Sequence, residues 1–157
     1  MSTKRWLIEG GIVLCLIAMV FLTLHERDLR DIAPVEIEQS MKKQFSGMQK
    51  ASDILLRKNF GIERDAVEGA VYYAASDFMD VREILILKTE EESVLTGARD
   101  TILARIEEEK EIFESYGPEQ FAQLQNAQIW MKAPWLVAVI CDDSAELCAQ
   151  IRGMIER

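Results

Sequence analysis

One stretch of nineteen residues, from Trp6 to Leu24, constrains this chain more than any other. After Trp6 it contains a single charged residue, Glu9, and a basic pair, Lys4 and Arg5, precedes it. As a helix, residues 7–24 would rise about 27 Å at about 1.5 Å per residue, close to the roughly 30 Å hydrocarbon core of a bilayer. A tryptophan beside basic residues is typical of a membrane interface. We therefore predict a single-pass transmembrane anchor over residues 6–24.

Two other interpretations of this stretch are a cleaved signal peptide and a lipoprotein signal. A signal peptide needs a small-x-small pair before the cleavage site, and the residues that follow the run, Thr23 to Arg27, contain none. A lipid-attachment site needs a small residue before its cysteine, and Leu14 precedes Cys15. An uncleaved signal anchor fits the sequence best.

The orientation of this anchor follows from the basic residues on either side. Lys4 and Arg5 favour a cytoplasmic N-terminus, although Arg27 and Arg30 nearly balance them. We predict a cytoplasmic tail over residues 1–5 and an extracytoplasmic C-terminal part, with a cytoplasmic domain as the alternative. The location that follows is the cytoplasmic membrane.

The remainder of the chain has the length of one ordinary domain. We predict a charged stalk over residues 25–33 and a soluble domain over residues 34–157. From residue 28 onward there are 15 Lys and Arg against 25 Asp and Glu, a formal charge of −10. Such an excess of negative charge argues against nucleic acid as a partner and against docking on anionic lipid.

Hydrophobic periodicity and helix-capping residues predict an α+β domain with a mainly antiparallel four-stranded sheet packed by helices, in the order αα-ββ-αα-ββ-α. The apolar core of residues 81–88 and the run at residues 135–141 predict two central strands that are covered on both faces. The expected helices span residues 35–45, 48–59, 90–116, 118–124 and 144–155, and the expected strands span residues 67–75, 81–88, 127–132 and 135–141.

Several local motifs resemble a bacterial family known as domain of unknown function 4358. They are Phe60-Gly61-Ile62, Tyr72-Tyr73, the strand from Val81 to Lys88, Arg105, the segment from Tyr116 to Gln120, and Asn126. The resemblance covers about residues 36–157. It implies a small α+β domain outside the cytoplasmic membrane, on a lipoprotein or single-span protein, and it supplies no catalytic residues.

The residue types exclude several kinds of site. His25 is the only histidine and lies outside the domain, which excludes a histidine-based catalytic triad or histidine metal site within it. The chain has no glycine-rich phosphate loop and no calcium-binding loop motif. We predict no catalytic residues, no cofactor and no metal.

Glu83 is the most informative charge, because it shares a strand with four consecutive aliphatic residues. Buried charges are normally paired, so we predict a structural ion pair between Glu83 and Arg105 on the covering helix. The alternative is a carboxylate with a raised pKa that acts as an acid or base. We interpret Asp77, Asp80, Asp142 and Asp143 as turn and cap residues.

Two further groups of residues remain open. Tyr72, Tyr73, Trp130 and Trp135 are either a binding surface for sugar or peptide, or cross-strand packing residues. Cys141 and Cys148 are either two buried thiols or a disulfide.

These observations support three functional hypotheses. The first is a membrane-tethered extracytoplasmic domain that recognises a protein or an envelope component without catalysis. The second is a cell-envelope enzyme that uses Glu83 or the aspartates. The third is a structural subunit of a membrane complex, in which Glu9 contacts another spanning helix.

Overall fold

The computed structural model describes residues 29–75 and 77–156. The chain divides into a large compact unit, Asp31–Ile155, and a second unit composed of Met1–Arg30 and Glu156–Arg157. In the second unit, Leu29 and Glu156 form an isolated antiparallel bridge. All helices and strands of the described residues belong to the large unit.

The large unit contains five α-helices, one 3-10 helix and five strands among its described residues. In chain order these are α2 (Pro34–Ser40), β1 (Gln49–Lys50), α3 (Asp53–Phe60), η1 (Arg64–Ala66), β2 (Gly69–Ala74), β3 (Glu83–Lys88), α4 (Glu92–Phe113), α5 (Pro118–Gln125), β4 (Gln128–Lys132), β5 (Trp135–Ile140) and α6 (Ser144–Ile155).

The strands form one sheet in the order β1-β2-β3-β5-β4, and every neighbouring pair is antiparallel. Both strands that were expected to be central, β3 and β5, lie inside the sheet. All residues from Ile84 to Leu87 and from Trp135 to Ile140 are buried. The side chains of a strand alternate between the two faces of a sheet, and here helices cover both faces. A central strand is therefore apolar at every position.

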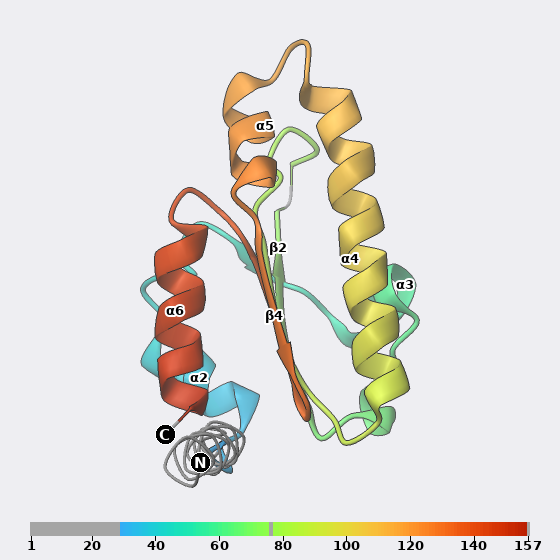
Figure 1. Cartoon of the computed structure of the whole chain (residues 1–157), viewed down its shortest axis with the longest axis vertical. Coiled ribbons are helices and arrows are strands. Elements are labelled where there is room, and N and C mark those ends of the chain that lie inside the picture. Colours follow the sequence, from blue (N-terminus) through green and yellow to red (C-terminus); the bar gives the residue numbers. More distant parts are fainter. Residues whose placement is uncertain (1–28, 76, 157) are drawn as a thin grey trace, which may run out of the picture. The chain divides into compact units, whose positions relative to one another are not determined.

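Helices α2 and α6 cover one face of the sheet and α3 and α4 lie on the other, while α5 packs against α4 near one end of the strands (Figure 1). The alternation along β3 sends Glu83, Leu85 and Leu87 toward α4, and the leucines join the main apolar cluster with Ile102 and Ile106 of that helix. The even-numbered residues of β3 point toward α2 and α6. The side facing α4 is named the α4 face below, and the other side is named the α6 face.

The prediction of four strands was wrong, because the sheet has a fifth, β1. Gln49 pairs with Ala74 and Lys50 with Tyr73, at the edge of the sheet. Both β1 residues are polar and exposed, so hydrophobic periodicity carries no signal for them. Backbone hydrogen bonding holds this edge, and the amide of Ala51 donates to the carbonyl of Tyr72 at 2.8 Å.

The predicted order αα-ββ-αα-ββ-α was wrong for the same region. The second helix begins at Asp53 rather than residue 48, because Ser52 is its N-cap and accepts a hydrogen bond from the amide of Leu55 at 3.4 Å. It ends at Phe60, and Gly61 after it adopts the left-handed conformation with φ of 69°, which glycine commonly supplies at a helix C-terminus.

The first helix of the domain is also shorter than predicted. It ends at Ser40, and residues 41–47 form turns. Met41 and Phe45 are nevertheless buried. The turns therefore bring these two side chains to the core without a continuous helix, whereas Val35 of α2, which the apolar spacing also placed inward, is 45% exposed.

The predicted spanning helix over residues 6–24 and the tail over residues 1–5 lie outside the described residues, as do residues 25–28 of the stalk. Within residues 29–75 and 77–156, no helix has both the length and the apolar character needed to cross a membrane. This element of the predicted fold therefore finds no support in the structure.

Candidate functional site

The α4 face contains a cavity of about 440 Å³, named the Glu83 pocket here, where the start of β3 and the C-terminal half of α4 meet the β2–β3 connection and α3. Its polar and charged lining residues are Asn59, Tyr72, Asp77, Asp80, Arg82, Glu83, Arg105 and Glu109. Its other lining residues are apolar or aromatic, namely Leu55, Ala74, Ala75, Phe78, Val81, Ile112, Phe113 and Tyr116.

A hydrogen-bonded network occupies the buried end of this pocket. Glu83, which is 7% exposed, accepts two hydrogen bonds at Oε1: one from the Tyr72 hydroxyl at 2.6 Å and one from Arg105 Nη1 at 2.8 Å. Asn59 Nδ2 donates to the Tyr72 hydroxyl at 2.7 Å. The predicted pair of Glu83 and Arg105 is therefore present, joined to a tyrosine. Whether it has a role beyond structure stays a prediction.

The register of the sheet explains why the sequence assembles this network. Glu83 pairs with Ala74, so Tyr72 lies two residues along β2 on the same face, within reach of the carboxylate. Arg105 reaches the carboxylate from α4, and its guanidinium lies 5.7 Å from the ring centre of Phe60, which also meets the Tyr72 ring edge-on at 5.2 Å. These contacts hold the network from four elements, α3, β2, β3 and α4.

Burial and charge shift the pKa values of these groups in consistent directions. Burial, together with the adjacent Glu83 carboxylate, raises the pKa of Tyr72 well above its usual value. Burial alone would lower the pKa of Arg105, but the charge and hydrogen bond of Glu83 outweigh burial and raise it. The tyrosine therefore stays neutral and the arginine stays charged at physiological pH, so the network is an ion pair with a neutral donor.

Glu109 is a second carboxylate in the pocket, one helical turn after Arg105. Burial raises its pKa; the charge of Arg105 opposes this shift, and Glu83 and Glu108 reinforce it. Glutamate runs such as residues 107–111 usually form a solvated helix face. Glu109 departs from this pattern, because it is half-buried and lines the pocket.

The outer rim of the pocket is apolar and exposed. Phe78 is 85% exposed, Ile112 is 52% exposed and Tyr116 is 56% exposed. Arg105, Glu109, Ile112 and Tyr116 have spacings of four, three and four residues, which place them on one stripe of α4 and its final turn. This stripe lies beside the buried one and gives the pocket its α4 wall.

The sequence contains one signal for this wall. Ile112 interrupts a glutamate-rich segment and lies off the buried stripe that includes Ile106 and Phe113. An apolar side chain at such a position does not pack in the hydrophobic core, so it is a candidate for an exposed binding surface. The position of Phe78 at the rim could not be predicted in this way, because Phe78 lies in a loop and hydrophobic periodicity does not determine loop conformation.

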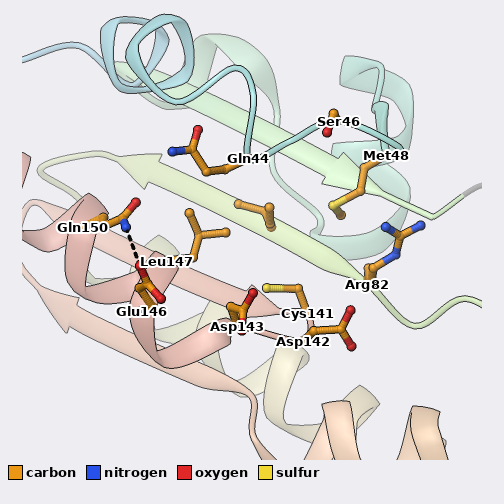
Figure 2. A pocket seen from close by; sticks show the side chains of 11 residues that line it. Gln44, Ser46, Met48, Arg82, Cys141, Asp142, Asp143, Glu146, Leu147 and Gln150 are labelled. Carbon is orange, nitrogen blue, oxygen red and sulfur yellow. Dashed lines mark hydrogen bonds between the residues drawn. The ribbon is translucent and has the colours of Figure 1, made fainter.

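The second cavity, of about 250 Å³, lies on the α6 face and is named the Cys141 pocket here. Figure 2 shows Arg82, Cys141 and Asp142 at one end of it and the hydrogen-bonded pair Glu146 and Gln150 along α6. Burial raises the pKa of the Cys141 thiol, which disfavours the reactive thiolate. Cys141 and Cys148 are both free thiols.

Arg82 and Asp142 of the Cys141 pocket are each paired with a residue outside its lining. Arg82 donates from Nε to Asp80 Oδ1 at 2.9 Å and from Nη2 to Asp80 Oδ2 at 2.6 Å. Asp142 Oδ1 accepts from Gln123 at 2.6 Å. Asp77 caps its own loop by accepting from the amide of Met79 at 2.9 Å. These contacts agree with turn and cap roles for Asp77 and Asp80.

The structure does not gather the four predicted aromatic residues on one surface. Tyr72 is buried on the α4 face. Tyr73 faces the other way, packs on Phe45 at 5.0 Å between ring centres, and donates to Glu38 at 2.6 Å. Trp135 is fully buried beneath Lys88. Trp130 lies under the guanidinium of Arg152 at 5.3 Å. Of the four, Tyr72 alone lines the Glu83 pocket.

No group of three or more His, Cys, Asp or Glu side chains in the described part of the chain is arranged to hold a metal ion. The chemistry available in the Glu83 pocket is that of paired charges, two further carboxylates, Asp77 and Glu109, and exposed apolar surface.

The chain matches the model of a protein family over residues 41–141, and that family is described as Domain of unknown function (DUF4358). The match covers more than half of the chain, so the protein belongs to this family. No curated protein and no solved structure gave a significant match. All residues that line the Glu83 pocket lie within the matched region.

Proposed function

We propose that this protein is a non-catalytic interaction domain that binds a protein partner at the Glu83 pocket. One observation carries the proposal: three large apolar side chains, Phe78, Ile112 and Tyr116, are exposed around one cavity. Exposed apolar surface that gathers around a concavity is typical of a recognition site, whereas single exposed apolar residues are normal.

The ion pair inside the pocket supports binding rather than catalysis. A general acid or base needs a carboxylate that can reach a substrate and exchange a proton. Glu83 is buried and accepts hydrogen bonds from Tyr72 and Arg105 through the same oxygen. This arrangement fixes the base of the pocket in one conformation, and a fixed base favours specific docking.

Two exposed apolar residues of α4 provide a matched test. Ile112 is 52% exposed and lines the pocket, whereas Leu103 is 45% exposed and does not. In the full-length protein, tagged and purified in detergent from its own cells, we expect Ile112→Asp to lose a partner that the wild type and Leu103→Asp both retain. Retention of the same proteins by all three versions, or of none by the wild type, would contradict the proposal.

The location outside the cytoplasmic membrane, which the sequence led us to expect, remains a prediction. Binding at the Glu83 pocket is independent of it, because every residue of the pocket belongs to the large unit.

A further inference from the structure

Two carboxylates that line the Glu83 pocket have no cationic partner within the described residues: Glu109, and the exposed Asp77, which accepts a hydrogen bond from the amide of Met79. Glu109 is half-buried in the pocket wall, and within residues 29–75 and 77–156 its carboxylate has neither a hydrogen bond nor an ion pair. Burial of a carboxylate without a donor is unfavourable, and a cation supplied by a ligand would relieve this cost.

The two cationic side chains that line the pocket are already engaged. Arg105 donates to Glu83 and lies against the ring of Phe60. Arg82 forms three hydrogen bonds with the carboxylate of Asp80. Each of these cations is therefore balanced by its own carboxylate, and the charge of Glu109 remains in excess. A partner with a carboxylate or phosphate at this position would meet repulsion.

The rim that surrounds Glu109 suits a long side chain with a charged end. Ile112 lies three residues after Glu109 and Tyr116 seven residues after it, so both flank the carboxylate on the same stripe of α4. Apolar side chains pack well against the methylene stem of lysine or arginine. The face of a tyrosine ring additionally attracts a cation. Exposed Glu108 and Glu111 extend the negative charge beyond the rim.

We propose that the partner inserts a lysine or arginine side chain into the Glu83 pocket, with its charged end at Glu109 and an adjacent apolar residue against Ile112 and Tyr116. This inference rests on the proposed function, because it specifies the chemistry of the same partner. The charge arrangement around Glu109, rather than the Glu83 ion pair, then determines specificity.

The test uses a library of random twelve-residue peptides displayed on phage and selected on the full-length protein in detergent, with the Ile112→Asp protein as the counter-selection. We expect the enriched peptides to contain lysine or arginine next to a leucine, isoleucine or aromatic residue. Enriched peptides without a basic residue would overturn the inference. They would leave the proposed function intact, because the counter-selection shows that they need Ile112. Failure to enrich any peptide would contradict both.

A pair of charge-neutralising variants then tests the role of Glu109 directly. For a synthetic enriched peptide, we expect Glu109→Gln to raise the dissociation constant about tenfold, and Glu108→Gln, a neighbouring exposed site outside the pocket lining, to change it less than about twofold. Replacement of the peptide's lysine by norleucine should remove the difference between wild type and Glu109→Gln. Equal effects of the two variants, or a difference that persists with norleucine, would overturn the inference.

Discussion

The two faces of strand β2 carry similar clusters of side chains in very different surroundings. On the α4 face, the Tyr72 hydroxyl donates to Glu83, which is paired with Arg105. On the α6 face, the hydroxyl of the next residue, Tyr73, donates at 2.6 Å to Glu38, whose other oxygen accepts from Lys50, also at 2.6 Å. Each face therefore has a tyrosine, a glutamate and a cation, named the Glu83 triad and the Glu38 triad.

The difference between the triads lies in what surrounds them. The side chain of Lys50 is 52% exposed, and neither Glu38 nor Lys50 lines either of the two cavities described above. The Glu83 triad forms the base of a pocket that also contains Glu109 and is bordered by Phe78, Ile112 and Tyr116. A tyrosine–glutamate–cation triad is thus a structural device on both faces, and it is the additional carboxylate and apolar rim that distinguish the α4 face.

The largest contrast should come from neutralising each glutamate. Glu83→Gln leaves the half-buried Arg105 without its counter-charge, and we expect a loss of about 3 kcal/mol in the free energy of unfolding. Glu38→Gln should cost about 1 kcal/mol, because Lys50 stays partly hydrated. Urea unfolding of both variants measures the difference. Equal losses of stability in the two variants would show that the two triads contribute equally despite their different surroundings.

Removal of each tyrosine hydroxyl should give a smaller contrast. Tyr72→Phe removes a hydrogen bond to a buried carboxylate and also leaves Asn59 without its acceptor, so we expect a loss of about 2 kcal/mol. Tyr73→Phe removes one hydrogen bond at a more exposed site, and about 1 kcal/mol is expected. Urea unfolding compares the two variants. A larger loss of stability for Tyr73→Phe would contradict the view that the Tyr72 hydroxyl lies in the more buried triad.

The smallest expected effects are opposite pH dependences of Glu38 and Glu109. Burial opposes ionisation of Glu38, but its hydrogen bonds with Lys50 and Tyr73 outweigh burial and lower its pKa below 4.5. Its stabilising contribution is therefore present above about pH 4.5 and is lost as the pH falls through the lowered pKa. The difference in free energy of unfolding between the wild type and Glu38→Gln should therefore disappear in acid.

The pKa of Glu109 is raised, so its effect has the other sign. The folded state binds a proton more tightly than the unfolded state, and stability falls as the pH rises from about 4.5 through the raised pKa. Glu109→Gln should therefore be more stable than the wild type at pH 7, by on the order of 0.5 kcal/mol, and equal to it at pH 4. Thermal unfolding at both pH values measures this. A variant less stable than the wild type at pH 7 would show that Glu109 is already paired.

The sequence predicted those parts of the fold that depend on apolar pattern. The run at Ile84–Leu87 identified a central strand, and helical spacing identified Leu95, Ala98 and Ile102 as buried residues of α4. The same spacing placed Tyr116 inward, which was wrong, because Tyr116 is 56% exposed. Strand β1 was missed because two exposed polar residues have no periodicity, and their pairing depends on the backbone of β2. The pattern of apolar residues reveals which side chains are buried, but it does not reveal which segment pairs with the edge strand of a sheet.

The candidate site was predicted only at its base. Glu83 and Arg105 could be connected because a charge within an aliphatic strand requires a counter-charge on the covering helix. Their tyrosine partner depended on strand register, which the sequence did not provide. The rim was not predicted, because Phe78 comes from a loop and Ile112 becomes informative only when the buried stripe of α4 is known.

The most direct test of the account compares positions around the pocket by photo-crosslinking in living cells. The photoreactive amino acid benzoylphenylalanine would replace Ile112 in one version of the full-length protein and Tyr116 in a second. In the control versions it would replace exposed Leu103 and Ile54, which lie outside the pocket lining. The account predicts a crosslinked species of one defined mass at positions 112 and 116 and little at 103 and 54. Crosslinks of equal yield at all four positions, or none at 112 and 116, would contradict it.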